Sequence, residues 1–212
     1  MKDRIIELYR DHHIDFYAVT AGPFIMGTIH LVTTILHFSW LILNYCLFCY
    51  IFLLIRALLT YLDKAHRKDK LTLAGAVSLI VLMIPMTVAM VKTIREKDAP
   101  AYVFFWMIYL YATYGTVKFI LAIRGRRRAR ISGDAFAGVM SWMSLVSAAY
   151  TLQMMEFALI ATFDTGMSHS MLLMQYFTHG AILIFTIFVI VHLLSKYRRW
   201  QSHEKQFKMC SE

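Results

Sequence analysis

The sequence predicts an all-α fold: a polytopic transmembrane helical bundle of about six spans, arranged as three antiparallel hairpins, with both termini in the cytoplasm. The chain of 212 residues is 59% hydrophobic and only 17% charged, whereas soluble domains are nearer a quarter charged. Its charges also fall in short clusters between apolar runs, and a bilayer-spanning helix needs about 20 apolar residues. Composition and spacing together indicate a single integral membrane domain over residues 1–212.

The first two spans are expected at 16–37 and 41–62, after a charged cytoplasmic tail at 1–15. Together they form a long stretch in which Arg56 is the one formally charged side chain, which is too long for one span and suits two antiparallel ones. We place the turn at 37–40, because Trp40 favours the membrane interface. A turn at 44–45 is the alternative.

The remaining spans are expected at 71–91, 101–123, 135–163 and 171–195, followed by a basic cytoplasmic tail at 196–212. Pro85 lies inside the third span and predicts a kink. The fifth span is long enough that it must tilt or project, and Glu156 is its one charged residue.

The basic residues predict the orientation, because cytoplasmic loops carry an excess of Lys and Arg. Seventeen of them lie in four alternate segments, namely the N-terminal tail, 63–70, 124–131 and the C-terminal tail, and three lie in 92–100. The segments 37–40 and 164–170 contain none. Six spans with both termini inside follow. Lys118 and Arg56, which lie within spans, are expected to extend to the cytoplasmic headgroups.

Residues 99–162 contain PAYVFFWMIYLYATYGTVKFILAIRGRRR followed by DAFAGVMSWMSLVSAAYTLQMMEFALI. This stretch resembles small, uncharacterised polytopic membrane proteins of Gram-positive bacteria. The resemblance implies the plasma membrane of a bacterium and supplies no activity.

Ionisable and amide side chains inside a bilayer are costly, so those in the expected spans are candidate functional residues. Glu156 and His179 lie about 10–12 Å below the outer surface, at 1.5 Å per helical residue. Gln153 precedes Glu156 by three residues and Gln175 precedes His179 by four, so each pair shares a helix face. A short loop joins these two spans, which predicts that they are neighbours.

These residues, with His30 from the first span, predict a polar pocket open to the outside and centred on Glu156. The alternative is that they form interhelical hydrogen bonds that hold the bundle together, as His, Gln and Asn often do in spans. A third interpretation is a transition-metal site formed by His30, Glu156 and His179. Cys46 and Cys49 form a CxxC that is compatible with a redox pair, but free cysteines are also ordinary small hydrophobic residues in a span.

The tyrosines of the fourth span, Tyr109, Tyr111 and Tyr114, line a cavity or pack at helix contacts; the pattern leaves both open. No catalytic motif and no phosphate-binding Gly-rich loop is recognisable, so we expect no enzyme activity and no cofactor.

Two functions remain. One is transport or binding of a small solute or ion through the pocket. The other is a non-catalytic membrane component that assembles with itself or with a partner subunit. The expected partners are the lipid bilayer and, at the basic loops, anionic lipid rather than nucleic acid.

Overall fold

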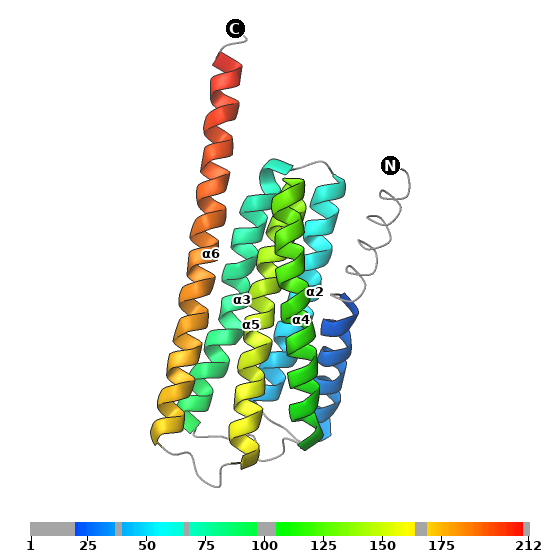
Figure 1. Cartoon of the computed structure of the whole chain (residues 1–212), viewed down its shortest axis with the longest axis vertical. Coiled ribbons are helices and arrows are strands. Elements are labelled where there is room, and N and C mark those ends of the chain that lie inside the picture. Colours follow the sequence, from blue (N-terminus) through cyan, green and yellow to red (C-terminus); the bar gives the residue numbers. More distant parts are fainter. Residues whose placement is uncertain (1–19, 37–39, 66–67, 97–104, 164–168, 210–212) are drawn as a thin grey trace.

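The computed structural model describes residues 20–36, 40–65, 68–96, 105–163 and 169–209. These residues form a helical bundle, which confirms the predicted all-α fold. Consecutive helices run in opposite directions (Figure 1). The elements are the first helix, Thr20–Leu36, followed by α2 (Trp40–Lys64), α3 (Lys68–Glu96), α4 (Phe105–Ser132), α5 (Ala135–Phe163) and α6 (His169–Met209).

Four of these helices are long and apolar enough to cross a bilayer, with candidate spans Ile42–Lys64, Lys70–Ala89, Ala135–Phe157 and Leu173–Ser202. The described first helix is apolar but shorter. In α4 the apolar part is followed by the Arg-rich stretch. The chain is therefore a membrane protein by helix length and composition, and the count of six spans stays a prediction.

The sequence leaves two positions open for the turn between the first helix and α2. The first helix extends to Leu36 and α2 begins at Trp40. Residues 37–39 of the expected turn lie outside the described residues. The alternative turn at 44–45 is wrong, because α2 continues as a helix through these positions. α3 is one helix with Pro85 inside it, and the kink expected at this proline stays a prediction.

Two segments expected to be non-helical extend the helices instead. The predicted loop at 124–131 is the last part of α4, because Arg and Ala are strong helix formers. The helix ends just before Gly133, whose φ of 65° suits glycine. The backbone N–H of Ala137 then donates to Asp134 Oδ2 at 3.0 Å, which caps α5.

The expected C-terminal tail is also helical, since α6 continues to Met209 over 41 residues. At 1.5 Å per residue its length is about 60 Å, roughly twice the thickness of a bilayer core. In Figure 1 the last part of α6 extends beyond the ends of its neighbours.

The bundle has an apolar exterior and polar groups inside. Phe177 and Ile184 are 81% and 70% exposed, whereas His30, Thr151 and Gln153 are buried. A soluble protein rarely exposes so many large apolar side chains. Lipid is the solvent that matches this surface, and polar side chains at helix contacts are typical of membrane bundles.

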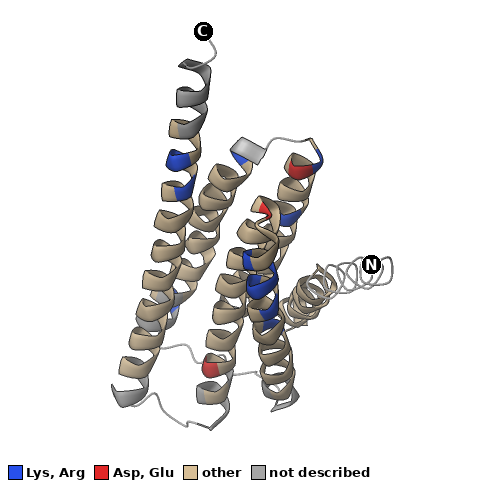
Figure 2. Ribbon diagram, turned by 45° about the horizontal axis from the view of Figure 1, so that its top comes forward, with Lys and Arg blue, Asp and Glu red and all other residues tan. Residues whose placement is uncertain are grey.

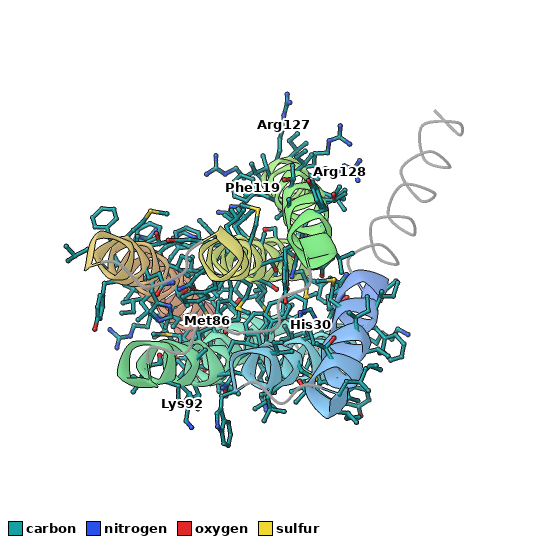
Figure 3. All side chains as sticks on the ribbon, turned by 90° about the horizontal axis from the view of Figure 1, so that it is seen from below. His30, Met86, Lys92, Phe119, Arg127 and Arg128 are labelled. Carbon is teal, nitrogen blue, oxygen red and sulfur yellow. The ribbon has the colours of Figure 1, made fainter. Side chains whose placement is uncertain are left out.

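α5 is the central helix, because it contacts α2, α3, α4 and α6. The first helix packs on α2 and α4 through Gly27 and His30. Seen from below, α6 and the first helix lie on different sides of the bundle (Figure 3). The described Lys and Arg residues lie mostly toward the end where α2 meets α3 and α4 meets α5 (Figure 2).

Candidate functional site

Gln153 of α5 and His179 of α6 form the centre of a buried polar group between these helices. Gln153 Nε2 lies 2.5 Å from His179 Nδ1. Gln153 is ten residues before the end of α5, and His179 is ten residues after the start of α6. The two antiparallel helices therefore bring both residues to the same level, about 15 Å from those helix ends.

Glu156 and Thr178 make a second contact between the same two helices. Thr178 Oγ1 donates to Glu156 Oε1 at 3.3 Å. Glu156 is half-buried, whereas Gln175, four residues before His179, is buried. We call Gln153, Glu156, Gln175, Thr178 and His179 the α5–α6 polar group.

Three buried atoms of this group have no hydrogen-bond partner in the described part of the chain: Gln153 Oε1, Gln175 Oε1 and His179 Nε2. Because Gln153 Nε2 donates to His179 Nδ1, the ring proton of neutral His179 is on Nε2. The α5–α6 polar group therefore contains one unused N–H donor and two unused amide acceptors, on the same pair of helices as the Glu156 carboxylate. Buried polar atoms without partners are rare and costly, and each one calls for a ligand, a water or a functional explanation.

His30 was expected in the same pocket, but the structure gives it other partners. Its Nδ1 bonds the backbone carbonyl of Met26, and its Nε2 bonds the hydroxyl of Tyr111. Since the carbonyl can only accept, Nδ1 carries a proton, and Nε2 can accept from Tyr111. Figure 3 shows His30 beside the first helix and α2, away from α6.

A second polar cluster, on the opposite side of α5, was not predicted. Lys118 is 5% exposed and its Nζ donates to Thr151 Oγ1 at 3.2 Å. Thr151 also bonds the Tyr45 hydroxyl at 3.1 Å and donates to the Ser147 carbonyl at 2.9 Å. The expectation that Lys118 extends to the cytoplasmic headgroups is wrong, because its ammonium is held inside the bundle.

We define the Lys118 cluster by the side chains around this ammonium: Tyr45, Cys49, Tyr114, Lys118, Tyr150 and Thr151. Thr151 and Gln153 are two residues apart on α5, so they project about 200° apart around the helix. The Lys118 cluster and the α5–α6 polar group therefore lie on opposite faces of α5.

The sequence does contain a signal for this cluster. Tyr111, Tyr114 and Lys118 follow i, i+3, i+7 spacing along α4, and Tyr45, Cys49 and Phe52 follow i, i+4, i+7 spacing along α2. Such spacings place each set on one helix face. Tyr109, the third tyrosine expected with Tyr111 and Tyr114 in the fourth span, is 62% exposed and does not belong to this face.

The described residues do not form the transition-metal site considered for His30, Glu156 and His179. Among the described residues, no three His, Cys, Asp or Glu side chains lie close enough to hold a metal ion, and His30 contacts Tyr111 rather than His179. Cys46 and Cys49 are both buried and free. Cys46 Sγ lies 3.4 Å from the Gly27 carbonyl, where it packs the first helix against α2.

The comparisons with known proteins leave the function to be argued from these residues. No family model, no curated protein and no solved structure matches this chain.

Proposed function

We propose that this membrane protein binds a small polar solute or ion, a cation above all, at the α5–α6 polar group and carries it across the bilayer. The observation that carries the proposal is the set of three buried polar atoms on α5 and α6 that have no hydrogen-bond partner among the described residues, on the same two helices as Glu156. Interhelical hydrogen bonds alone explain the Gln153–His179 contact but leave these three atoms without a role.

The chemistry of the group favours a cation or a solute that carries one. Two amide oxygens and a carboxylate are acceptors, whereas His179 Nε2–H is the one unused donor among the three orphan atoms. An intramembrane carboxylate is also a typical part of an ion or proton pathway. The proposed role is binding and transport without catalysis.

The positive-inside rule suggests how the protein sits in a plasma membrane. If the basic end is cytoplasmic, Glu156 lies in the outer half, because it is seven residues from the end of α5 opposite that basic end. The group would then be reached first from the outside.

Uptake into proteoliposomes tests the proposal. Vesicles loaded with dyes for H⁺, Na⁺ and K⁺ are given the matching ion gradients, and a panel of radiolabelled amino acids and small amines is added separately. We expect at least one probe to enter, and Glu156→Gln to slow its entry about tenfold or more, since a charge-assisted hydrogen bond is worth roughly 1.5–3 kcal/mol.

The matched control is Asp63→Asn, which makes the same chemical change at the end of α2. It should transport like the parent. Equal uptake by the parent and Glu156→Gln would remove the carboxylate from the mechanism.

Assembly with a partner is the second candidate, and two observations favour it. The apolar window of α6 is the least buried of the four candidate spans, and Arg127 on α4 points away from the bundle (Figure 3). Arg126, in contrast, stacks over Trp142 with its Cζ 3.9 Å from the ring centroid. Copurification of a stoichiometric partner that is lost in Arg127→Gln, and kept in Arg124→Gln, would favour this function over transport.

A further inference from the structure

Lys118 is a buried cation whose partners in the described residues are all neutral. Its ammonium donates to Thr151 Oγ1 and lies 5.1 Å from the ring centroid of Tyr114 and 5.5 Å from that of Phe52. The ammonium also interacts electrostatically with the thiol of Cys49 and is repelled by the guanidinium of Arg56. No Asp or Glu of the described part of the chain pairs with it.

This arrangement is costly for a protonated lysine. Removing an ammonium from water costs several kcal/mol unless an opposite charge and further hydrogen bonds compensate it. Thr151 satisfies one of the three N–H donors. The ammonium otherwise lies near two aromatic rings and is repelled by Arg56, so a negative charge at this position would stabilise the site.

The Lys118 cluster also contains two tyrosine hydroxyls that are free to donate hydrogen bonds. The hydroxyls of Tyr114 and Tyr150 are buried and have no hydrogen-bond partner among the described residues. The Tyr114 ring centroid lies 5.1 Å from the ammonium, and the Tyr150 ring packs 5.8 Å from that of Tyr45, whose hydroxyl bonds the same Thr151 as the ammonium. The Tyr45 hydroxyl is taken by Thr151, and that of Tyr111 by His30.

We propose that the Lys118 cluster binds a small monocarboxylate, with the Lys118 ammonium as counter-charge and the Tyr114 and Tyr150 hydroxyls as hydrogen-bond donors. A carboxylate accepts at about four positions on two oxygens, which matches several donors from different helices. One ammonium bonded to a neutral hydroxyl in an aromatic environment suits one negative charge better than two. This site is distinct from the α5–α6 polar group and does not depend on the function proposed for it.

The competing explanation is that Lys118 serves only to hold α4 against α5. In that case the ammonium–Thr151 hydrogen bond stabilises the fold, loss of Lys118 destabilises the protein, and no anion changes the stability. The two explanations therefore predict opposite results for the same variants.

The test measures the melting temperature of the purified, detergent-solubilised full chain by tryptophan fluorescence. Sodium acetate, sodium lactate and sodium chloride are compared at equal ionic strength. Saturating acetate or lactate should raise the Tm by about 2–6 °C relative to chloride, since a ligand that binds only the folded state stabilises it by mass action. An equal Tm in all three salts would overturn the proposal.

Two variants locate the effect. Lys118→Met should abolish the difference between acetate and chloride, and in chloride it should be at least as stable as the parent, because it removes an uncompensated buried charge. Lys70→Met, at an exposed lysine of α3, should keep the full acetate response. An acetate response that survives in Lys118→Met, or a Lys118→Met protein that is less stable than the parent in chloride, contradicts the proposal.

Tyr150→Phe gives an independent reading that does not alter charge. The substitution removes only a hydroxyl that has no hydrogen-bond partner among the described residues, so the stability in chloride should not fall. The concentration of acetate needed for half of the Tm shift should rise about fivefold or more, since a hydrogen bond to a charged group is worth about 1.5–3 kcal/mol. An unchanged acetate dependence would show that the Tyr150 hydroxyl is not part of the site.

Discussion

Thr151 joins three helices through a single hydroxyl. Its Oγ1 receives Lys118 from α4 and Tyr45 from α2, and it donates to the carbonyl of Ser147 within α5. The residue is fully buried. Two polar groups on neighbouring helices therefore depend on this one side chain.

Thr151→Val should be destabilising because it keeps the shape of the side chain and removes the hydroxyl. The Lys118 ammonium and the Tyr45 hydroxyl lose their shared acceptor, and we expect the free energy of unfolding to fall by about 1–2 kcal/mol. Thr151→Ser keeps the hydroxyl and should cost less. Denaturant unfolding of the two variants in the same detergent measures the difference; equal stabilities would show that leaving the two buried donors without this acceptor costs nothing.

At the residue scale, sequence periodicity predicted neighbours on one helix but not partners on different helices. Gln153 and Gln175 lie on the same helices as Glu156 and His179, three and four residues away, and this spacing is a local property that the sequence shows. His30 and Lys118 have partners that are far away in the sequence, Tyr111 and Thr151. In a span that is apolar nearly all round, the pattern does not show which face meets which neighbour.

At the element scale, α3 and α5 approach closely at Gly75. A Cβ at this position would lie 2.4 Å from Val139 Cγ1, which is closer than two carbon atoms can approach without a shift of the helices or of the valine. Small residues at such points let transmembrane helices pack closely. The contact fixes how the central helix sits against α3.

Gly75→Ala should therefore destabilise the bundle by about 1–3 kcal/mol, the usual cost of overpacking. Val139→Ala removes the clashing methyl group, so the double variant should be more stable than Gly75→Ala alone. Gly180→Ala on α6 is the control, since nothing lies within 4 Å of its added Cβ. Thermal unfolding of the parent, the single variants and the double variant in detergent measures these effects. Equal stability of Gly75→Ala and Gly180→Ala would contradict the close packing at Gly75.

The helices themselves were largely predictable, and their ends were not. Long apolar runs separated by charge clusters predicted where helices lie, because a bilayer span requires about 20 apolar residues. Because the apolar residues end earlier, the fourth and sixth spans were predicted to end at 123 and 195. Both helices continue, α4 to Ser132 and α6 to Met209, because a helix ends where capping and backbone conformation end it, and Gly133 and Asp134 supply that signal after α4.

At the scale of the whole molecule, the bundle is apolar on its surface as well as in its core. Large apolar side chains cover its surface, and two of its buried polar groups, the α5–α6 polar group and the Lys118 cluster, lie on opposite faces of the central helix α5. In hydrocarbon these groups can be satisfied only by each other, by water or by a ligand. Both proposals, a cation or solute at the α5–α6 polar group and a monocarboxylate at the Lys118 cluster, follow from that constraint.

The direction in which the molecule crosses the membrane decides from which side each group is reached. The basic residues of α4 and of the end of α6 lie toward the same end of the bundle (Figure 2), and the positive-inside rule assigns that end to the cytoplasm. Single cysteines in a background without the three native cysteines report this directly. Arg127→Cys marks the basic end, and Thr165→Cys marks the expected 164–170 loop.

The decisive measurement is labelling of these two variants in intact cells with a membrane-impermeant maleimide. We expect Thr165→Cys to react at once and Arg127→Cys to react only after the membrane is opened. Reaction of Arg127→Cys in intact cells would place the basic end outside and contradict the account.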